Sequence, residues 1–93
     1  MNQILGKVVR VLEVKLSGAN DFKTQKVHVI TDEQYPQTVE IEFKQGNCAL
    51  LDGLVLEQKV KIDINLKGRE WKNPEGVVSV FNTLEGWKIE KLA

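Results

Sequence analysis

The residues best suited to recognising a ligand lie in one segment near the C-terminal end, GREWKNPEG, from Gly68 to Gly76. It carries a tryptophan beside an arginine and a lysine: Trp71, Arg69 and Lys72. Aromatic rings stack on bases and cations pair with phosphates, so this mixture suits single-stranded nucleic acid. A second segment, SGANDFK at 17–23, contributes a phenylalanine and a lysine of the same kind.

The predicted nucleic-acid-binding residues are the aromatic and basic side chains of these two segments and of the strands beside them. A loop phenylalanine often folds back onto a core, and a tryptophan beside a turn often covers the end of a barrel, so a structural role is the alternative for both rings. The predicted set is Phe22, Lys23, Lys26, Lys67, Arg69, Trp71 and Lys72.

The sequence contains no motif that favours catalysis. Its carboxylates form no paired motif, and it has no glycine-rich phosphate loop between a strand and a helix. The single histidine, His28, has no neighbouring cysteine or acidic cluster, which is typical of a surface or packing residue rather than a metal ligand. Cys48 is expected to be a small buried hydrophobic residue. We therefore expect no enzymatic activity, no cofactor and no metal ion.

The composition describes one small domain without a net charge. A chain of 93 residues cannot support two hydrophobic cores, so residues 1–93 are expected to form a single domain. Thirteen basic residues balance thirteen acidic ones, so affinity for a polyanion requires a local patch. The lone cysteine excludes an internal disulfide and fits a reducing compartment. Without a signal peptide or a bilayer-length apolar run, the expected location is the cytoplasm, with no membrane partner.

Alternating apolar residues predict five strands. The patterns cover residues 3–16, 24–31, 38–44, 60–66 and 77–92. The first and last have apolar residues in both alternation frames, so each is expected to bend, the first at Gly6 and the last at Gly86. A short helix is expected within residues 46–56.

Three further details concern the helix, a loop and the last strand. The helix is expected to use Asn47 as its N-cap and to end at Gly53. The turn chemistry of Gly68, Asn73, Pro74 and Gly76 predicts a loop that contains GREWK. In the last strand, the larger apolar residues are expected to be mostly structural; these are Phe81, Trp87 and Ile89.

Three strands, a short helix and two strands, with curved first and last strands, predict an all-β OB-fold, a five-stranded Greek-key barrel. Another small β-barrel, of the SH3 type, is the main alternative. The helix between the third and fourth strands favours the OB-fold.

Five segments of the chain also carry a resemblance: QYPQ (34–37), LLDG (50–53), NLKGREW (65–71), NPEG (73–76) and FNTLEGWKIEKL (81–92). They resemble a family of short bacterial OB-fold proteins of unknown function, found mainly in Bacteroidetes. The resemblance implies an OB-fold and a loose similarity to single-stranded DNA-binding and primosomal proteins. In that family a basic residue and an aromatic are expected before the FN pair, where this chain has Ser79 and Val80, so the resemblance does not imply a stacking surface on that strand.

Two functions remain open at this point. OB-folds bind through the outer face of the second and third strands and the loops beside it, which favours single-stranded DNA or RNA. Glu40 and Glu42 are expected on that face, where they repel a polyanion and only Lys26 and Lys44 offset them. The alternative is therefore a protein-interaction module that binds a protein partner or self-associates as a homo-oligomer.

Overall fold

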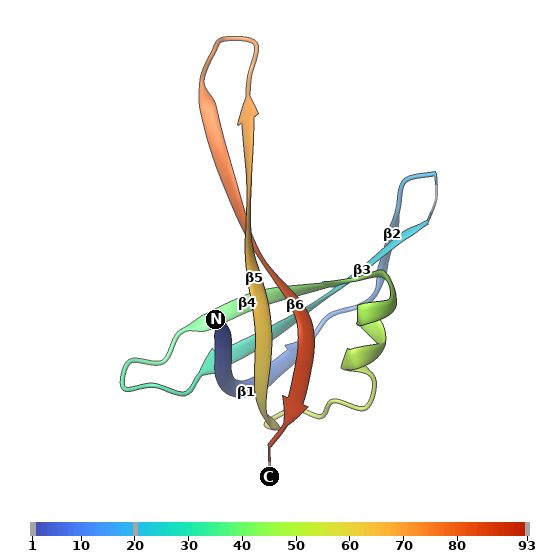
Figure 1. Cartoon of the computed structure of the whole chain (residues 1–93), viewed down its shortest axis with the longest axis vertical. Helices are drawn as coiled ribbons and strands as arrows, with labels where there is room; N and C mark the ends of the chain where they lie inside the picture. Colours follow the sequence, from blue (N-terminus) through green and yellow to red (C-terminus); the bar gives the residue numbers. More distant parts are fainter. Residues whose placement is uncertain (1, 20, 93) are drawn as a thin grey trace.

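The structure, a computed structural model, describes residues 2–19 and 21–92. Within them it contains six strands and one short 3-10 helix (Figure 1). In chain order these are β1 (Gln3–Val11), β2 (Lys15–Ser17), β3 (Phe22–Thr31), β4 (Thr38–Lys44), the 3-10 helix η1 (Gln45–Leu51), β5 (Lys59–Lys72) and β6 (Val78–Lys91).

The strands form one sheet that closes on itself. Its order is β1-β5-β6-β4-β3-β2, and β1 also pairs with β3, which completes the ring. All pairs are antiparallel except β4 with β6, which run parallel. The short β2 only extends the hairpin that it forms with β3. This is the predicted OB-fold, with η1 between the third and fourth strands of the barrel.

The barrel interior is filled by aliphatic side chains and one phenylalanine. The alternation of β3 and β4 sends Val27, Val29, Ile41 and Phe43 inward, and all four are fully buried. Val8 of β1 and residues of β5 and η1 complete the core, and these are Cys48, Leu51, Val60, Ile62 and Ile64. None of residues 67–83 belongs to this core, and Figure 1 shows the upper part of β5 and β6 rising beyond the other strands.

The bend in the first strand differs from the prediction. The sequence suggested one strand over residues 3–16 with a bulge at Gly6, but β1 ends at Val11 and the register with β3 shifts between Val8 and Arg10. Gly6 is buried at another close contact, since a Cβ there would overlap the carbonyl group of Ile30. Backbone packing therefore accounts for this glycine, and the bulge lies a few residues later.

The bend in the last strand is where it was expected. The β5–β6 register shifts between Asp63 and Ile64, whose partners are Lys88 and Gly86, so Trp87 is the extra residue. Gly86 is also required by packing, because a Cβ at this position would overlap the ring of Phe43.

The helix prediction is correct in place and wrong in detail. η1 is a 3-10 helix that begins at Gln45, after Lys44, so Asn47 lies inside it and is not its N-cap. It ends at Leu51, two residues before Gly53, whose φ of +79° lies in the left-handed region that glycine favours.

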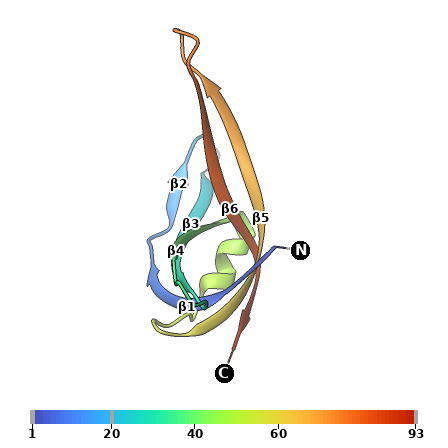
Figure 2. The ribbon, with the colours of Figure 1, turned by 90° about the vertical axis from the view of Figure 1, so that its left-hand side faces the viewer.

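The C-terminal hairpin extends far beyond the barrel. Residues 67–72 of β5 pair with residues 78–83 of β6, and residues 73–77 connect them; we call this hairpin, residues 67–83, the arm. It rises from the barrel as a two-stranded ribbon in Figure 1, and it curves in the side view of Figure 2. The prediction that GREWK forms a loop is therefore wrong, since these residues belong to β5.

The turn chemistry is concentrated at the tip of the arm. Asn73 Oδ1 accepts hydrogen bonds from the backbone N–H groups of Glu75 at 3.0 Å and Val77 at 2.9 Å. Gly76 has a φ of +86° and donates its N–H to the carbonyl of Asn73. Gly68 takes no part in the turn and pairs with Asn82 in the ladder. The hairpin therefore turns five residues later than a break at Gly68 would require.

Candidate nucleic-acid interface

One face of the arm meets the outer face of β4 in a broad hollow. Alternate residues of a strand share a face, and residues directly opposite on a neighbouring strand share it too. This rule places Lys67, Arg69 and Trp71 of β5 beside Phe81 of β6. The hollow encloses about 670 Å³, and we call it the arm groove; it is lined by Glu42, Lys44, Lys67, Gly68, Arg69, Trp71, Phe81, Thr83 and Glu85.

Two aromatic rings in the arm groove are open to solvent. Trp71 is 54% exposed and Phe81 is 60% exposed. Arg69 lies directly opposite Phe81, and Trp71 lies opposite Ser79, so the two rings are diagonal neighbours on one face. Such positions are roughly 7–8 Å apart in an antiparallel pair, within reach of large side chains. The arrangement offers two adjacent surfaces on which bases can stack.

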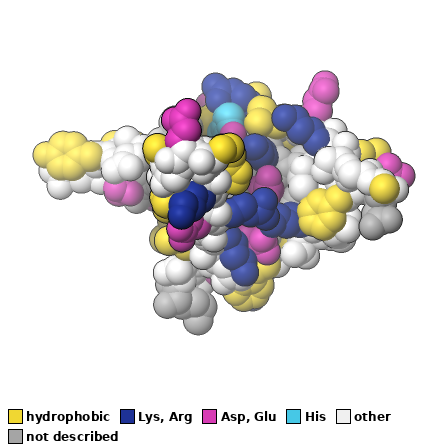
Figure 3. Space-filling view, turned by 90° about the horizontal axis from the view of Figure 1, so that it is seen from above, with side chains coloured by type: hydrophobic (Ala, Val, Ile, Leu, Met, Phe, Trp, Pro, Cys, Tyr) yellow, Lys and Arg dark blue, Asp and Glu magenta, His cyan; other side chains and the backbone are white. Residues whose placement is uncertain are grey.

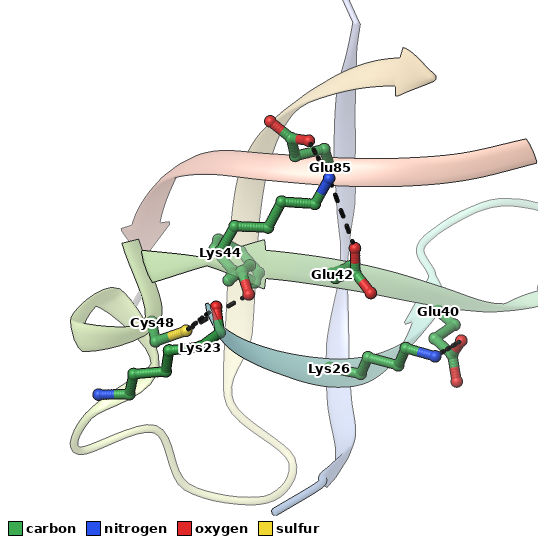
Figure 4. A network of polar contacts seen from close by, with 8 residues as sticks. Lys23, Lys26, Glu40, Glu42, Lys44, Cys48 and Glu85 are labelled. Atoms are coloured by element: carbon green, nitrogen blue, oxygen red, sulfur yellow. Dashed lines mark hydrogen bonds and ion pairs between the residues drawn. The ribbon is translucent and has the colours of Figure 1, made fainter. Parts of the chain in front are cut away.

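The charges of the arm groove are mixed, with three cations and two carboxylates. Lys44 Nζ lies 3.1 Å from Glu85 Oε2 and 3.8 Å from Glu42 Oε1, between two acidic residues on neighbouring strands (Figure 4). Lys67 and Arg69 stand further out along the arm. Both carboxylates are therefore opposed by a lysine of the same groove, which limits their repulsion of a phosphate.

Two smaller hollows continue the arm groove across the barrel. One, of about 290 Å³, shares Glu42 and Thr83 with the arm groove and reaches Lys26 and Glu40. The next, of about 130 Å³, shares Lys26 and Glu40 and reaches Lys15 of β2. Basic and acidic side chains lie side by side over the face seen from above (Figure 3). The groove is thus the end of a longer path with mixed charge.

Glu40 is held by two neighbours on β3. His28 Nε2 lies 2.8 Å from Glu40 Oε2, and Lys26 Nζ lies 3.4 Å from Glu40 Oε1. The hydrogen bond from His28 is the main cause of a lowered pKa of the Glu40 carboxyl; the charge of Lys26 adds to it, and partial desolvation opposes it. Glu40 therefore stays ionised and paired at neutral pH.

Three of the seven predicted binding residues are brought together by the structure. Lys67, Arg69 and Trp71 line the arm groove, and Lys26 lines the hollow next to it. Lys72 belongs to the other alternation frame, opposite Val78, and so lies on the other face of the arm.

The remaining two predicted residues, Phe22 and Lys23, begin β3 and do not line the arm groove. Phe22 is 38% exposed, so it is not part of the buried core. Lys23 N–H donates to Gln45 Oε1 at 3.2 Å, and the Lys23 carbonyl lies 3.9 Å from Cys48 Sγ. Both belong to β3 and not to the loop that the sequence predicted.

Two predictions about the aromatic residues of β6 are wrong. Phe81 and Trp87 were both expected to be structural, but Phe81 lines the arm groove and Trp87 is 43% exposed at the bulge. Ile89 is partly buried against the core, as expected. The signal for Phe81 was available in the sequence: a connection limited to residues 73–77 pairs Lys72 with Val78, and hence Arg69 with Phe81.

Cys48 has the structural role that the sequence predicted. It is buried, and its thiol lies 3.3 Å from the Phe43 carbonyl. Burial raises the pKa of the Cys48 thiol, which keeps the sulfur protonated. Within residues 2–19 and 21–92, no group of three or more His, Cys, Asp or Glu is placed to hold a metal ion. The same part of the chain contains no helix long and apolar enough to span a membrane.

A closed five-stranded barrel with an aromatic and cationic groove at one side defines a small OB-fold protein with a candidate nucleic-acid interface. Residues 3–90 match the family described as a domain of unknown function, DUF3127, and the chain belongs to that family. This confirms the resemblance to an OB-fold family of unknown function. No curated protein sequence matches the chain.

Solved structures with a similar fold are single-stranded DNA-binding proteins. Rim1, a mitochondrial protein of this class from S. cerevisiae, has a TM-score of 0.72 at 12% identity, over 98% of this chain and 92% of its own. The protein from Thermus aquaticus has a TM-score of 0.70 at 18% identity, over 100% of this chain and 50% of its own. The protein from Plasmodium falciparum, solved with single-stranded DNA, has a TM-score of 0.66 at 15% identity, over 99% and 93% of the two chains. At these identities the similarity establishes the fold.

Proposed function

We propose that the protein binds single-stranded nucleic acid in the arm groove, without catalysis. The observation that carries this proposal is the exposure of Trp71 and Phe81 as diagonal neighbours on one face, with Arg69 opposite Phe81. Bases stack on exposed rings whatever their sequence, and nearby cations neutralise the phosphates that join them. The similar fold of single-stranded DNA-binding proteins supports the same function.

The proposed contacts differ from the set expected from sequence. Phe81 and Lys44 join Lys67, Arg69 and Trp71 as contact residues, because all five line the arm groove. Two adjacent rings suggest two stacked bases, with the backbone of the strand passing over the cations of β4 and β5. Lys26 would contact the continuation of the strand across β3.

The carboxylates of the arm groove reduce the electrostatic part of its affinity for nucleic acid. Three cations against two carboxylates leave a small positive excess. Affinity is therefore expected to depend more on stacking than on phosphate neutralisation, and salt is expected to weaken binding less steeply than it does for strongly basic proteins.

A titration of intrinsic fluorescence with oligo-dT at low and moderate salt tests the proposal. Stacking on Trp71 should quench its emission, and Trp71→Ala should remove both the quenching and most of the affinity. Trp87→Ala is the matched control, because Trp87 is also exposed but does not line the arm groove. Circular dichroism of each variant verifies the fold. If oligo-dT does not bind even at low salt, the proposal is wrong.

A second candidate function, binding of a protein, is favoured by the other face of the arm. Leu66, just before the arm, is 61% exposed, and Val78 and Val80 are 49% and 63% exposed. The pairing of β5 with β6 places all three in the frame opposite to Trp71 and Phe81. Exposed aliphatic residues on a ribbon are typical of a contact with a protein partner or a second copy of the chain.

Sedimentation velocity distinguishes self-association from the proposed function. If the aliphatic face joins two copies, the protein sediments as a dimer and Val80→Asp returns it to a monomer. Oligo-dT binding by the monomeric variant would then show that the two faces act independently, because Val80 does not line the arm groove.

A further inference from the structure

A row of three polar side chains crosses the outer face of the barrel on β1, β3 and β4. Arg10 is the register partner of His28, which is the partner of Glu40. Arg10 Nη1 lies 2.7 Å from His28 Nδ1, and His28 Nε2 lies 2.8 Å from Glu40 Oε2. Both ring nitrogens therefore have a charged partner.

The chemistry of the two partners fixes the state of the ring. A guanidinium can only donate hydrogen bonds and a carboxylate can only accept them. Nδ1 of His28 must therefore accept from Arg10, and Nε2 must carry the hydrogen donated to Glu40. Only the neutral ring with its proton on Nε2 satisfies both bonds.

The groups that face His28 come from all three strands of the row. Arg10 approaches from β1, Glu40 from β4, and Lys26 of β3 lies 3.4 Å from Glu40. The His28 side chain is only 18% exposed, whereas Glu40 is 48% exposed. Lys26 and Glu40 also line the hollows that lead to the arm groove. Glu40 is thus the end of the row that borders the path proposed for the nucleic acid, and Arg10 lies two strands away on the same face.

We propose that Arg10 and Lys26 form a second phosphate subsite on this path, and that protonation of His28 frees Arg10 to use it. This inference rests on the proposed function and names a contact residue, Arg10, outside the arm groove. The ligand group is a backbone phosphate of the bound single strand.

The mechanism follows from the loss of one acceptor. When His28 takes a proton from solvent, Nδ1 becomes a donor and can no longer accept from Arg10. Two positive charges then face each other across a former hydrogen bond, while the bond from Nε2 to the Glu40 carboxylate becomes an ion pair and strengthens. The ring stays with Glu40, and the guanidinium of Arg10 turns toward solvent. The face gains both the imidazolium charge and an accessible guanidinium.

The salt dependence of oligo-dT binding at about pH 7.5 and about pH 5.5 tests this subsite, because histidine titrates between these values. Each additional phosphate neutralised steepens the slope of log K against log salt by about 0.7 for a single strand. For the wild type, this slope should be steeper by about 0.7 to 1.4 at the lower pH. His28→Gln should show the same slope at both pH values, and Arg10→Gln should lose part of the increase.

A control substitution on the same strand makes the result specific. Lys7 is another cation of β1; it lies 3.6 Å from Glu57 and lines a different hollow. The slope measured for Lys7→Gln should therefore become steeper at low pH by the same amount as that of the wild type. Equal slopes for the wild type at both pH values, or an unchanged increase in His28→Gln, would overturn the inference.

A measurement on the free protein separates this inference from the proposed function. The side-chain nitrogen resonances of Arg10 report whether its guanidinium is held or rotates freely, and the His28 ring signals report its protonation. The two should change together. If Arg10 stays held after His28 ionises, the release mechanism is wrong even if oligo-dT binds. If oligo-dT binds at neither pH, the proposed function fails, whatever Arg10 does.

Discussion

At the scale of single residues, Lys44 is the side chain on which the electrostatics of the arm groove depend. It lies within 4 Å of both Glu42 and Glu85, at 3.8 Å and 3.1 Å. A phosphate that binds Lys44 must compete with two carboxylates already in place. Glu42 and Glu85 are therefore expected to weaken nucleic-acid binding while they order the lysine.

Removal of either carboxylate should tighten binding. Glu42→Gln or Glu85→Gln leaves Lys44 with one competitor fewer, and the expected gain in oligo-dT affinity is about 0.2–1 kcal/mol, the size of a single surface ion pair. Fluorescence anisotropy of a labelled oligonucleotide measures it. Glu57→Gln removes the same charge from the Lys7 pair outside the groove and should have little effect. A weaker affinity in the groove variants would refute this account of Lys44.

The ionised Glu40 should contribute to stability, and this contribution should be lost in acid. Its folded-state pKa is lowered from 4.5, so between that value and the folded-state pKa the unfolded chain binds more protons than the folded one. The free energy of unfolding should therefore fall as the pH drops below about 5 and through the folded-state pKa. Urea titrations across this range should show a shallower fall for Glu40→Gln. Parallel curves would show that the His28 and Lys26 contacts contribute nothing to stability.

At the scale of the elements, the inward residues of β3 and β4 were predictable from the alternation of apolar residues, whereas the length of β5 and β6 was not. The alternation of β3 and β4 is strict, so the inward set of Val27, Val29, Ile41 and Phe43 was predictable from sequence. The extent of the last two strands was not, because Gly68 interrupts the apolar pattern in the same way as a turn. The tertiary ladder continues through Gly68 and converts a predicted loop into strand.

The curved strands were predictable for a different reason. Apolar residues in both frames require a change of phase, and the structure has a bulge in each strand. The pattern locates the bulge near Gly86 correctly but not near Gly6, since a glycine marks either a bulge or a close contact and the sequence does not distinguish them.

Gly86 is expected to tolerate no side chain. A methyl group at this position overlaps the ring of the fully buried Phe43, and overpacking of a core typically costs about 1–3 kcal/mol. Gly86→Ala should lower the midpoint of urea unfolding accordingly. Gly46→Ala is the matched control, because a Cβ there meets no atom within 4 Å. Similar effects of the two substitutions would contradict the packing explanation.

The arm should be separable from the barrel. The core contains no residue of the arm, and Gly68 lies directly opposite Asn82. Replacement of residues 69–81 by an Asn-Gly turn would therefore close the hairpin at an existing pair with a two-residue connection. Circular dichroism and cooperative unfolding should be retained, whereas oligo-dT binding should be lost. Retention of full affinity by the shortened protein would move the binding site away from the arm.

At the scale of the whole molecule, neutral net charge and a local interface are compatible. Thirteen basic and thirteen acidic residues cancel overall, yet the arm groove gathers three cations with two exposed rings. The sequence identified part of this site, Lys67, Arg69 and Trp71, from residue type alone. It missed Phe81 and assigned Lys72 to the same site, because GREWK was interpreted as a loop and the register that sets the face of each residue was therefore not considered.

Neither the fold nor the family identifies a ligand, so the functional proposal comes from the residues of the site. DUF3127 is a domain of unknown function, and the similarity to single-stranded DNA-binding proteins is 18% identity or lower in the structures compared above. The functional proposal therefore depends on the two rings of the arm groove. Removal of both rings therefore tests the proposal most directly.

The most direct test is the affinity for labelled oligo-dT of the wild type and of the double variant Trp71→Ala/Phe81→Ala, at low salt. Loss of a stacked base costs about 1–3 kcal/mol, so the double variant should bind at least tenfold more weakly, with its barrel intact by circular dichroism. Trp87→Ala should bind as the wild type does. Equal affinity of the double variant and the wild type, or no binding by either protein, would contradict the central claim.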